Sequence, residues 1–204
     1  MISNKLTEIG DYAFNECSSL IQIEIPSTVK KIGNGAFNEC SLFKKVAIPL
    51  FVTTINERTF YKCTSLEEII IPSLVNSIQY AAFYCCSSLK KVTFSEPSQL
   101  NSIGIYAFYS CLSLEEVKIP SLVKKIDLGA FKNCSSLAQI FIPSNTSMIG
   151  YHSFEGCSSL KQISIPSSVT SIGNCTFKGC SNLKQVVIPS SVTYIGPSAF
   201  AECS

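Results

Sequence analysis

The side chains in this sequence that are best suited to chemistry are its eleven cysteines. A thiolate can act as a nucleophile, bind a metal ion or form a disulfide. Nine of the cysteines come three residues after a phenylalanine and recur at nearly constant spacing: Cys17, Cys40, Cys63, Cys86, Cys111, Cys134, Cys157, Cys180 and Cys203. Such regularity favours a structural role, because a free cysteine behaves as a small buried apolar residue. We predict a ladder of reduced thiols that face the core.

Disulfides within this ladder are not expected, although stacking would bring neighbouring Cα atoms to about 5 Å. Parallel side chains that point the same way fit the torsion angle of a disulfide poorly. Cys85 and Cys175 fall outside the regular spacing and are better candidates for exposed thiols.

Acid–base, nucleophilic and metal chemistry lack the necessary partners. His152 is the single histidine, and no CxxC or HxxxH spacing occurs, so a zinc site is not expected. Without a second histidine, the many serines lack an evident base. Glu67 and Glu68 are neighbours in an expected strand, unlike two carboxylates that converge on one bond. We therefore expect no enzyme activity, no catalytic residue, no cofactor and no bound metal.

The cysteine spacing is one part of a repeat that covers the chain. Its phenylalanines recur in steps of 23 residues, with one step of 25: Phe14, Phe37, Phe60, Phe83, Phe108, Phe131, Phe154, Phe177 and Phe200. The longer step comes from two extra residues, Ser95 and Glu96, before Pro97. A unit of this size cannot bury its own apolar side, so the units must stack and share one continuous core.

Each unit has the form LxxV/IxIPxxVxxIGxxAFxxCxx. The LxxVxI segment alternates apolar and polar positions and predicts a short strand, which the following proline ends. VxxIG predicts a second short strand or an extended segment, and AFxxC predicts a tight turn or a single 3₁₀ turn. At about 4.8 Å per turn, the stack would be roughly 40 Å long.

Units such as LKQISIPSSVTSIGNCTFKGC, residues 160–180, resemble the BspA-type (Treponema pallidum-type) leucine-rich repeat, LxxLxLPxxLxxIGxxAFxxCxx. The resemblance implies a right-handed leucine-rich repeat solenoid, α/β or mainly β. Its parallel sheet would lie on the concave face, with turns, 3₁₀ segments or short strands on the other side. We expect residues 1–204 to form one domain of about nine units that belongs to a longer array. Departures from the pattern are local, as at Phe43, Asn56, Gln79, Asp127, Thr59, Ser153 and Thr146.

Composition and charge exclude several functional classes. The chain has 204 residues, of which 15% are charged, and a net charge of +2, so no strong field attracts nucleic acid or anionic lipid. Its apolar runs are far shorter than the roughly 18 residues of a membrane span. The start, MISNKLTEIG, lacks the layout of a signal peptide.

The cellular location stays open between two alternatives. Members of the resembling family are often surface or secreted proteins of bacteria and of parasitic protists such as trichomonads and Entamoeba, so the resemblance favours the cell surface or secretion. The absence of a visible signal peptide leaves a cytoplasmic location open.

Candidate binding residues occupy the strand positions that the core does not dictate. Four successive pairs alternate in charge: Lys44–Lys45, Glu67–Glu68, Lys90–Lys91 and Glu115–Glu116. Opposite charges on neighbouring strands stabilise pairing modestly. The pattern has two interpretations, register control with solubility, or selection of a protein partner. Lys118 and the solvent-facing Ile70, Phe141 and Val187 extend this candidate surface.

A second candidate surface consists of tyrosines that gather in the turn region near the Ser95–Glu96 insertion. Its core is Tyr84, Tyr106 and Tyr109, with Tyr61 and Tyr80 nearby in the sequence pattern. Tyrosine is enriched where proteins meet. Stacking along a turn ridge is the structural alternative.

The sequence thus points to a protein-binding repeat module, with a role in cell-surface adhesion or host interaction and a host surface or matrix protein as partner. An intracellular regulatory scaffold is the alternative, and reduced thiols favour it. Neither end carries a polar capping helix, so we also expect either continuation of the array or end-to-end self-association.

Overall fold

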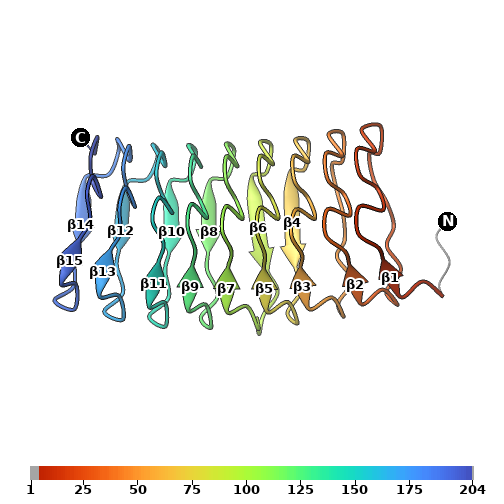
Figure 1. Ribbon diagram of the computed structural model, residues 1–204, viewed down its shortest axis with the longest axis horizontal. Coiled ribbons are helices and arrows are strands. Elements are labelled where there is room, and N and C mark those ends of the chain that lie inside the picture. The colour runs from red at the N-terminus through yellow and green to blue at the C-terminus, as the bar shows by residue number, and fades with distance from the viewer. Residues whose placement is uncertain (1–4, 204) are drawn as a thin grey trace.

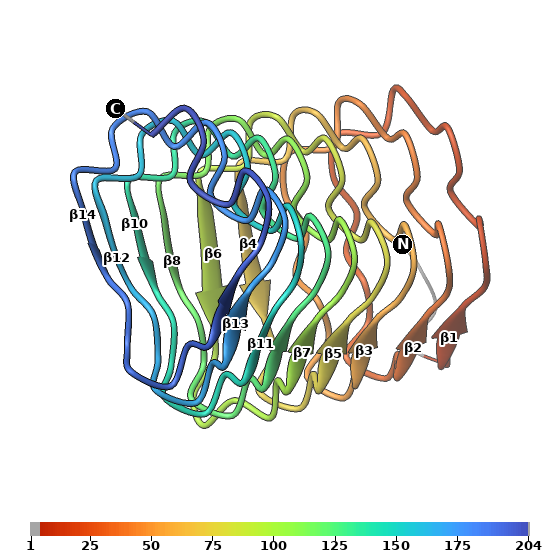
Figure 2. The ribbon, with the colours of Figure 1, turned by 60° about the vertical axis from the view of Figure 1, so that its left-hand side comes forward.

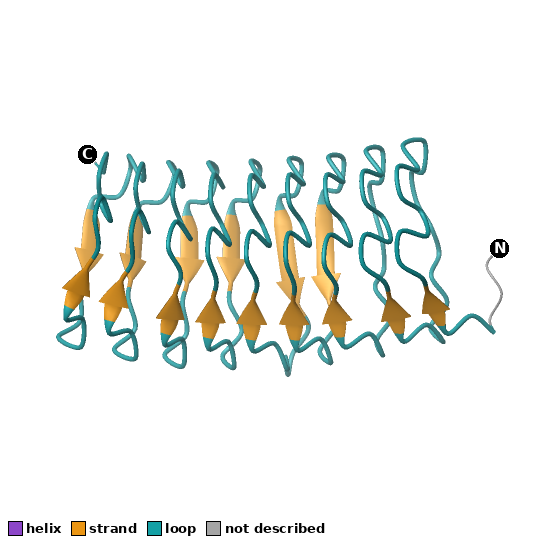
Figure 3. Ribbon diagram, viewed as in Figure 1, coloured by secondary structure: helices purple, strands orange, loops and turns teal. Residues whose placement is uncertain are grey.

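Both apolar stretches of the repeat form strands in the computed structural model, which describes residues 5–203 (Figure 1). Each unit makes one turn of a solenoid, and its strands lie beside the equivalent strands of the neighbouring units (Figures 1 and 2). Every strand pair among the described residues is parallel. Residues 5–203 contain no helix, so the fold is a mainly β leucine-rich repeat solenoid (Figure 3).

The LxxVxI segments form one column of strands, hydrogen-bonded in a four-stranded and a two-stranded set, which together we name the long-strand sheet. Its members have three or four residues: β4 (Glu68–Ile71), β6 (Lys91–Phe94), β8 (Glu116–Lys118), β10 (Gln139–Phe141), β12 (Gln162–Ser164) and β14 (Gln185–Val187). In the first two repeats the same segment makes an isolated bridge between Gln22 and Lys45. The predicted strand is therefore confirmed from the third repeat onward.

The VxxIG segments form a second column, which we name the short-strand sheet. Its strands have two residues each: β1 (Glu8–Ile9), β2 (Lys31–Ile32), β3 (Thr54–Ile55), β5 (Ser77–Ile78), β7 (Ser102–Ile103), β9 (Lys125–Ile126), β11 (Met148–Ile149), β13 (Ser171–Ile172) and β15 (Tyr194–Ile195). The isoleucine is buried in every strand from β1 to β13. This confirms the second short strand.

The AFxxC segment is a tight turn, and residues 5–203 contain no 3₁₀ segment there. Each turn holds two residues with positive φ, four positions apart, such as Ala81 (φ 52°) and Cys85 (φ 55°). In this turn alternate amides donate to the next repeat: the Phe83 N–H bonds the Ala107 carbonyl at 2.8 Å, and the Cys85 N–H bonds the Tyr109 carbonyl at 2.7 Å. These bonds offset the cost of the left-handed conformation in residues other than glycine.

The phenylalanines form a continuous stack at the centre of the molecule. The rings from Phe37 to Phe177 are fully buried, and successive centroids lie 5.1–5.6 Å apart. Phe43, which replaces the usual leucine, is also buried and stacks on Phe37 at 5.1 Å. Burial of each ring against both neighbouring repeats supplies the shared core that one unit lacks.

The regular cysteines line the same core. Seven of them are buried, and each thiol donates to the carbonyl of the phenylalanine one repeat earlier, as Cys63 Sγ does to Phe37 O at 3.1 Å. Burial raises the pKa of Cys134 to about 12 and of Cys40 to about 11, so these thiols stay protonated and can donate. The prediction that all nine face the core is wrong at Cys17, which is exposed, because no preceding repeat among the described residues covers it.

Candidate protein-binding surfaces

The long-strand sheet places carboxylates beside amino groups, as the alternating sequence predicts. Strand register pairs Glu68 with Lys91 and Lys91 with Glu116. One position earlier, Lys90 Nζ lies 3.7 Å from Glu67 Oε2, with both side chains more than half exposed. Exposed pairs of this kind contribute only about 0–1 kcal/mol to stability. The alternation therefore offers a charge pattern to solvent more than it holds the sheet together.

These charged side chains line a groove of 520 Å³ across β4, β6 and β8, which we name the charged groove. Six of the predicted site residues meet there: Glu68, Lys90, Lys91, Glu115, Glu116 and Lys118. Phe94 and Glu96 also line it, so the insertion after β6 contributes one side. The sequence does not indicate that contribution, because it depends on how the extra residues fold back beside the strands.

Exposed apolar residues flank the charged groove. Ile70, which is 60% exposed, lines an adjoining hollow of 290 Å³ together with Glu67 and Lys45. On the other side, Phe141 of β10 is 57% exposed and lies in register with Lys118. Val187 is exposed too, but it belongs to β14 at the far end of the sheet and is not part of this cluster. Ile70 and Phe141 thus fit an apolar border around a charged centre.

The tyrosines form a second surface on the turns, which we name the tyrosine ridge. Tyr61, Tyr84 and Tyr109 occupy the position after the core phenylalanine and stack face to face, with centroids 4.8 and 4.4 Å apart. Tyr106 meets Tyr109 edge to face at 5.7 Å, and Tyr80 meets Tyr106 in the same way at 6.4 Å. The structural alternative, stacking along a ridge, is therefore present, and the three stacked rings are half-buried.

Two cations that the sequence did not single out belong to this ridge. The guanidinium of Arg58 lies over the rings of Tyr61 and Tyr80, at 5.8 and 5.5 Å from their centroids. Lys132 follows Tyr109 in the same column of the next repeat. Aligning the repeats column by column could have found both residues, because each occupies a position that aligns with tyrosines in other repeats.

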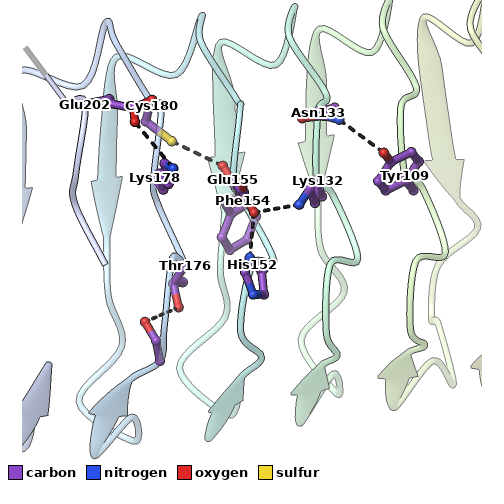
Figure 4. A network of polar contacts seen from close by, with 11 residues as sticks. Tyr109, Lys132, Asn133, His152, Phe154, Glu155, Thr176, Lys178, Cys180 and Glu202 are labelled. Atoms are coloured by element: carbon purple, nitrogen blue, oxygen red, sulfur yellow. Dashed lines mark hydrogen bonds and ion pairs between the residues drawn. The ribbon is translucent and has the colours of Figure 1, made fainter. Parts of the chain in front are cut away.

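Polar contacts continue the ridge beyond the tyrosines (Figure 4). The Glu155 carboxylate accepts a hydrogen bond from Lys132 Nζ at 2.8 Å and lies 2.6 Å from His152 Nδ1. Asn133 donates to the Tyr109 hydroxyl at 3.4 Å. Burial acts to raise the pKa of Glu155, but the hydrogen bonds with Lys132 and His152 outweigh it and hold the pKa below its ordinary value. His152 thus has a structural partner, one repeat beyond Lys132.

Comparison with known families decides what these repeats are. The sequence profile described as BspA type leucine-rich repeat region matches residues 1–104 and 101–204, which together span the chain. The chain belongs to the BspA-type leucine-rich repeat family. Membership of this family implies a protein-binding repeat module, and BspA-type repeats typically bind partners without being enzymes.

Two solved structures of leucine-rich repeat proteins are similar to this chain. The leucine-rich repeat protein of T. pallidum, TpLRR, is 26% identical with a TM-score of 0.75, over 96% of this chain and 80% of that one. A leucine-rich repeat protein from Bacteroides ovatus is 25% identical with a TM-score of 0.56, over 97% of this chain and 68% of that one. A separate comparison with curated proteins finds no match.

The described part of this BspA-type chain offers little else for chemistry. Between residues 5 and 203, no group of three or more histidine, cysteine, aspartate or glutamate side chains is placed to hold a metal ion. Over the same residues, no helix has the length and apolar character that crossing a membrane requires. Cys85 and Cys175, expected to be exposed, are half-buried, and burial raises the pKa of Cys85. The candidate surfaces are therefore the charged groove with its apolar border and the tyrosine ridge.

Proposed function

We propose that this protein binds another protein through the long-strand sheet, with the charged groove as the centre of contact. The observation that carries the proposal is the meeting of seven charged side chains of both signs in one 520 Å³ groove, bordered by the exposed Ile70 and Phe141. A charged pattern selects a partner by complementarity, and apolar residues beside it supply contact area. The partner would present an inverse pattern of charges and a small apolar patch.

The finer proposal is a role in cell-surface adhesion, with a host surface or matrix protein as partner. This proposal is supported by the frequent occurrence of BspA-type proteins at cell surfaces. The unpaired state of all eleven cysteines favours the alternative, an intracellular regulatory scaffold. Counting free thiols and glycans on protein isolated from its source separates the two, because eleven free thiols without glycans would contradict adhesion.

The binding test compares three variants on immobilised protein with candidate host surface and matrix proteins as ligands. Phe141→Ala and Lys90→Glu should each lower the affinity for a captured partner at least tenfold. The first variant removes an apolar contact, and the second reverses a charge in the groove. Lys184→Glu is the matched control, since it makes the same change at the same strand position outside the charged groove. Equal loss in the control, or no loss in the two groove variants, would show that binding lies elsewhere.

A further inference from the structure

The tyrosine ridge contains a second groove, of 340 Å³, which shares no residue with the charged groove. Its lining consists of Arg58, the five ridge tyrosines and Lys132. Arg58 belongs to the repeat that begins at Phe43 and Lys132 to the one that begins at Leu114, three repeats later, so the two cations stand at opposite ends of the tyrosines. Three repeats at about 4.8 Å each put them roughly 14 Å apart along the solenoid.

The lining of this tyrosine groove carries two positive charges and no carboxylate. Burial, with Tyr109 beside it, raises the pKa of Tyr84 to about 12, so its hydroxyl stays neutral and can donate. The nearest carboxylates belong to neighbours outside the lining: Glu57 is 3.9 Å from Arg58 Nε, and Glu155 bonds Lys132. The Arg58 Nε is shielded from solvent and has no hydrogen-bond partner among the described residues. The lining of the groove is therefore positively charged, and the carboxylates that partly offset this charge lie outside it.

The arrangement of the rings in the tyrosine groove favours an acidic peptide over an anionic saccharide as ligand. A saccharide needs a free aromatic face on which to stack, but stacking covers both faces of Tyr84 and one face each of Tyr61 and Tyr109. The face of Tyr80 is taken by Arg58. What remains is a line of ring edges and hydroxyl donors between two cations, which suits carboxylates on an extended chain. An extended peptide covers the roughly 14 Å between the cations with four or five residues.

We propose that the tyrosine groove binds an acidic, extended peptide segment of a protein partner, with carboxylates held by Arg58 at one end and Lys132 at the other. The tyrosine hydroxyls donate hydrogen bonds to carboxylates or backbone carbonyls between them. This inference rests on the proposed function only in taking a protein as the partner. The surface, residues and chemistry of the tyrosine groove are separate from those of the charged groove.

The test measures the affinity of the full chain for a fluorescein-labelled octapeptide of alternating glutamate and glycine, by fluorescence polarisation at low ionic strength. The octapeptide of alternating glutamine and glycine should bind at least tenfold more weakly, because it lacks the carboxylates. Affinity for the glutamate peptide should fall as salt rises. The double variant Arg58→Gln with Lys132→Gln should lose at least tenfold in affinity, because charge-assisted hydrogen bonds are the strong ones.

Three controls keep the outcome decisive. Lys178→Gln makes the same charge change in the column of Lys132, outside the groove, and should change affinity less than twofold. Lys90→Glu in the charged groove should also leave peptide affinity unchanged, which separates this proposal from the proposed function. Tyr84→Phe, which keeps the ring stack, should weaken binding about threefold through the lost hydroxyl.

Several results would overturn the proposal. These are equal binding of the glutamine peptide, unchanged affinity in a folded Arg58→Gln/Lys132→Gln double variant, or equal loss in Lys178→Gln. Low-molecular-weight heparin is the polysaccharide arm of the test, and tight binding of heparin without binding of the glutamate peptide would assign the groove to a glycan instead. Thermal melting of each variant checks that the repeat stack is intact.

Discussion

The phenylalanine column and the tyrosine column are two aromatic ladders built by the same repeat, one position apart in sequence. The inner rings are fully buried and stack at 5.1–5.6 Å. The outer rings, Tyr61, Tyr84 and Tyr109, stack at 4.4–4.8 Å and remain half-buried. The spacing of the repeats therefore sets the stacking distance in both columns. The side of the turn on which a ring lies decides whether it is buried in the core or lies nearer the surface. The inner ladder supplies stability, and the outer ladder is free to supply a surface.

The largest effect on stability is expected from removing one ring of the inner ladder. Phe131 is fully buried between Phe108 and Phe154, with centroids 5.3 and 5.6 Å away. Phe131→Ala should lower the free energy of unfolding by about 3–5 kcal/mol, because it leaves a cavity in the shared core. Denaturant melts measure the change, and an unaltered midpoint would contradict the inward position of this column.

The equivalent change in the outer ladder should cost less. Tyr84→Ala removes stacking on two neighbours but opens no cavity in the core, so we expect a loss of about 1–2 kcal/mol. Tyr84→Phe keeps the stack and should alter stability by less than about 0.5 kcal/mol. If Tyr84→Ala matched Phe131→Ala in denaturant melts, the outer ladder would be a second core and not a surface.

Beyond the tyrosines, the outer column continues with Lys132 and Glu155, whose pairing should depend on pH. The pKa of Glu155 lies below the ordinary value of 4.5, since hydrogen bonds from Lys132 and His152 outweigh burial. A lowered pKa means that the contribution is complete above the ordinary pKa and is lost as pH falls through the lowered one. The stability difference between parent and Glu155→Gln, about 1 kcal/mol at neutral pH, should shrink as the pH falls through the lowered pKa of Glu155. A stability difference between parent and variant that increased in acid would contradict a lowered pKa of Glu155.

The smallest effect is expected in the long-strand sheet. Lys90 and Glu67 are exposed and lie 3.7 Å apart, so a double-mutant cycle with Lys90→Ala and Glu67→Ala should give about 0.2–1 kcal/mol of coupling. The coupling should diminish in high salt. A coupling well above that range would mean that the alternating charges serve the sheet more than they serve a partner.

The sequence predicts the columns in which the residue type repeats, for a physical reason. Each Phe, each inner Cys and each strand isoleucine must meet its own copy in the next turn, so spacing alone reveals the column. The alternating charges around Lys90 were visible in the same way. The bulk of the fold and six residues of the charged groove follow from this register.

What the sequence did not reveal depends on contacts between different columns. The role of Arg58 comes from rings that lie in its own repeat and in the next one, and no single column shows that meeting. The left-handed residues of the turns escaped notice because most are not glycine: His152 and Asn133 adopt φ of 58° and 62°, and glycine occupies each of these two columns in only two other repeats. Phe94 and Glu96 join the charged groove only through the local course of an insertion.

That insertion has a practical consequence. Ser95 and Glu96 lengthen one corner of the solenoid, yet β6 stays in register with β4, and β7 stays in register with β5. The corner after β6 thus accepts added length while the next strand, β7, stays in register with its neighbours on both sides. Such corners are ready-made attachment points for grafted loops or epitopes, which the rigid scaffold would then display at intervals of one turn.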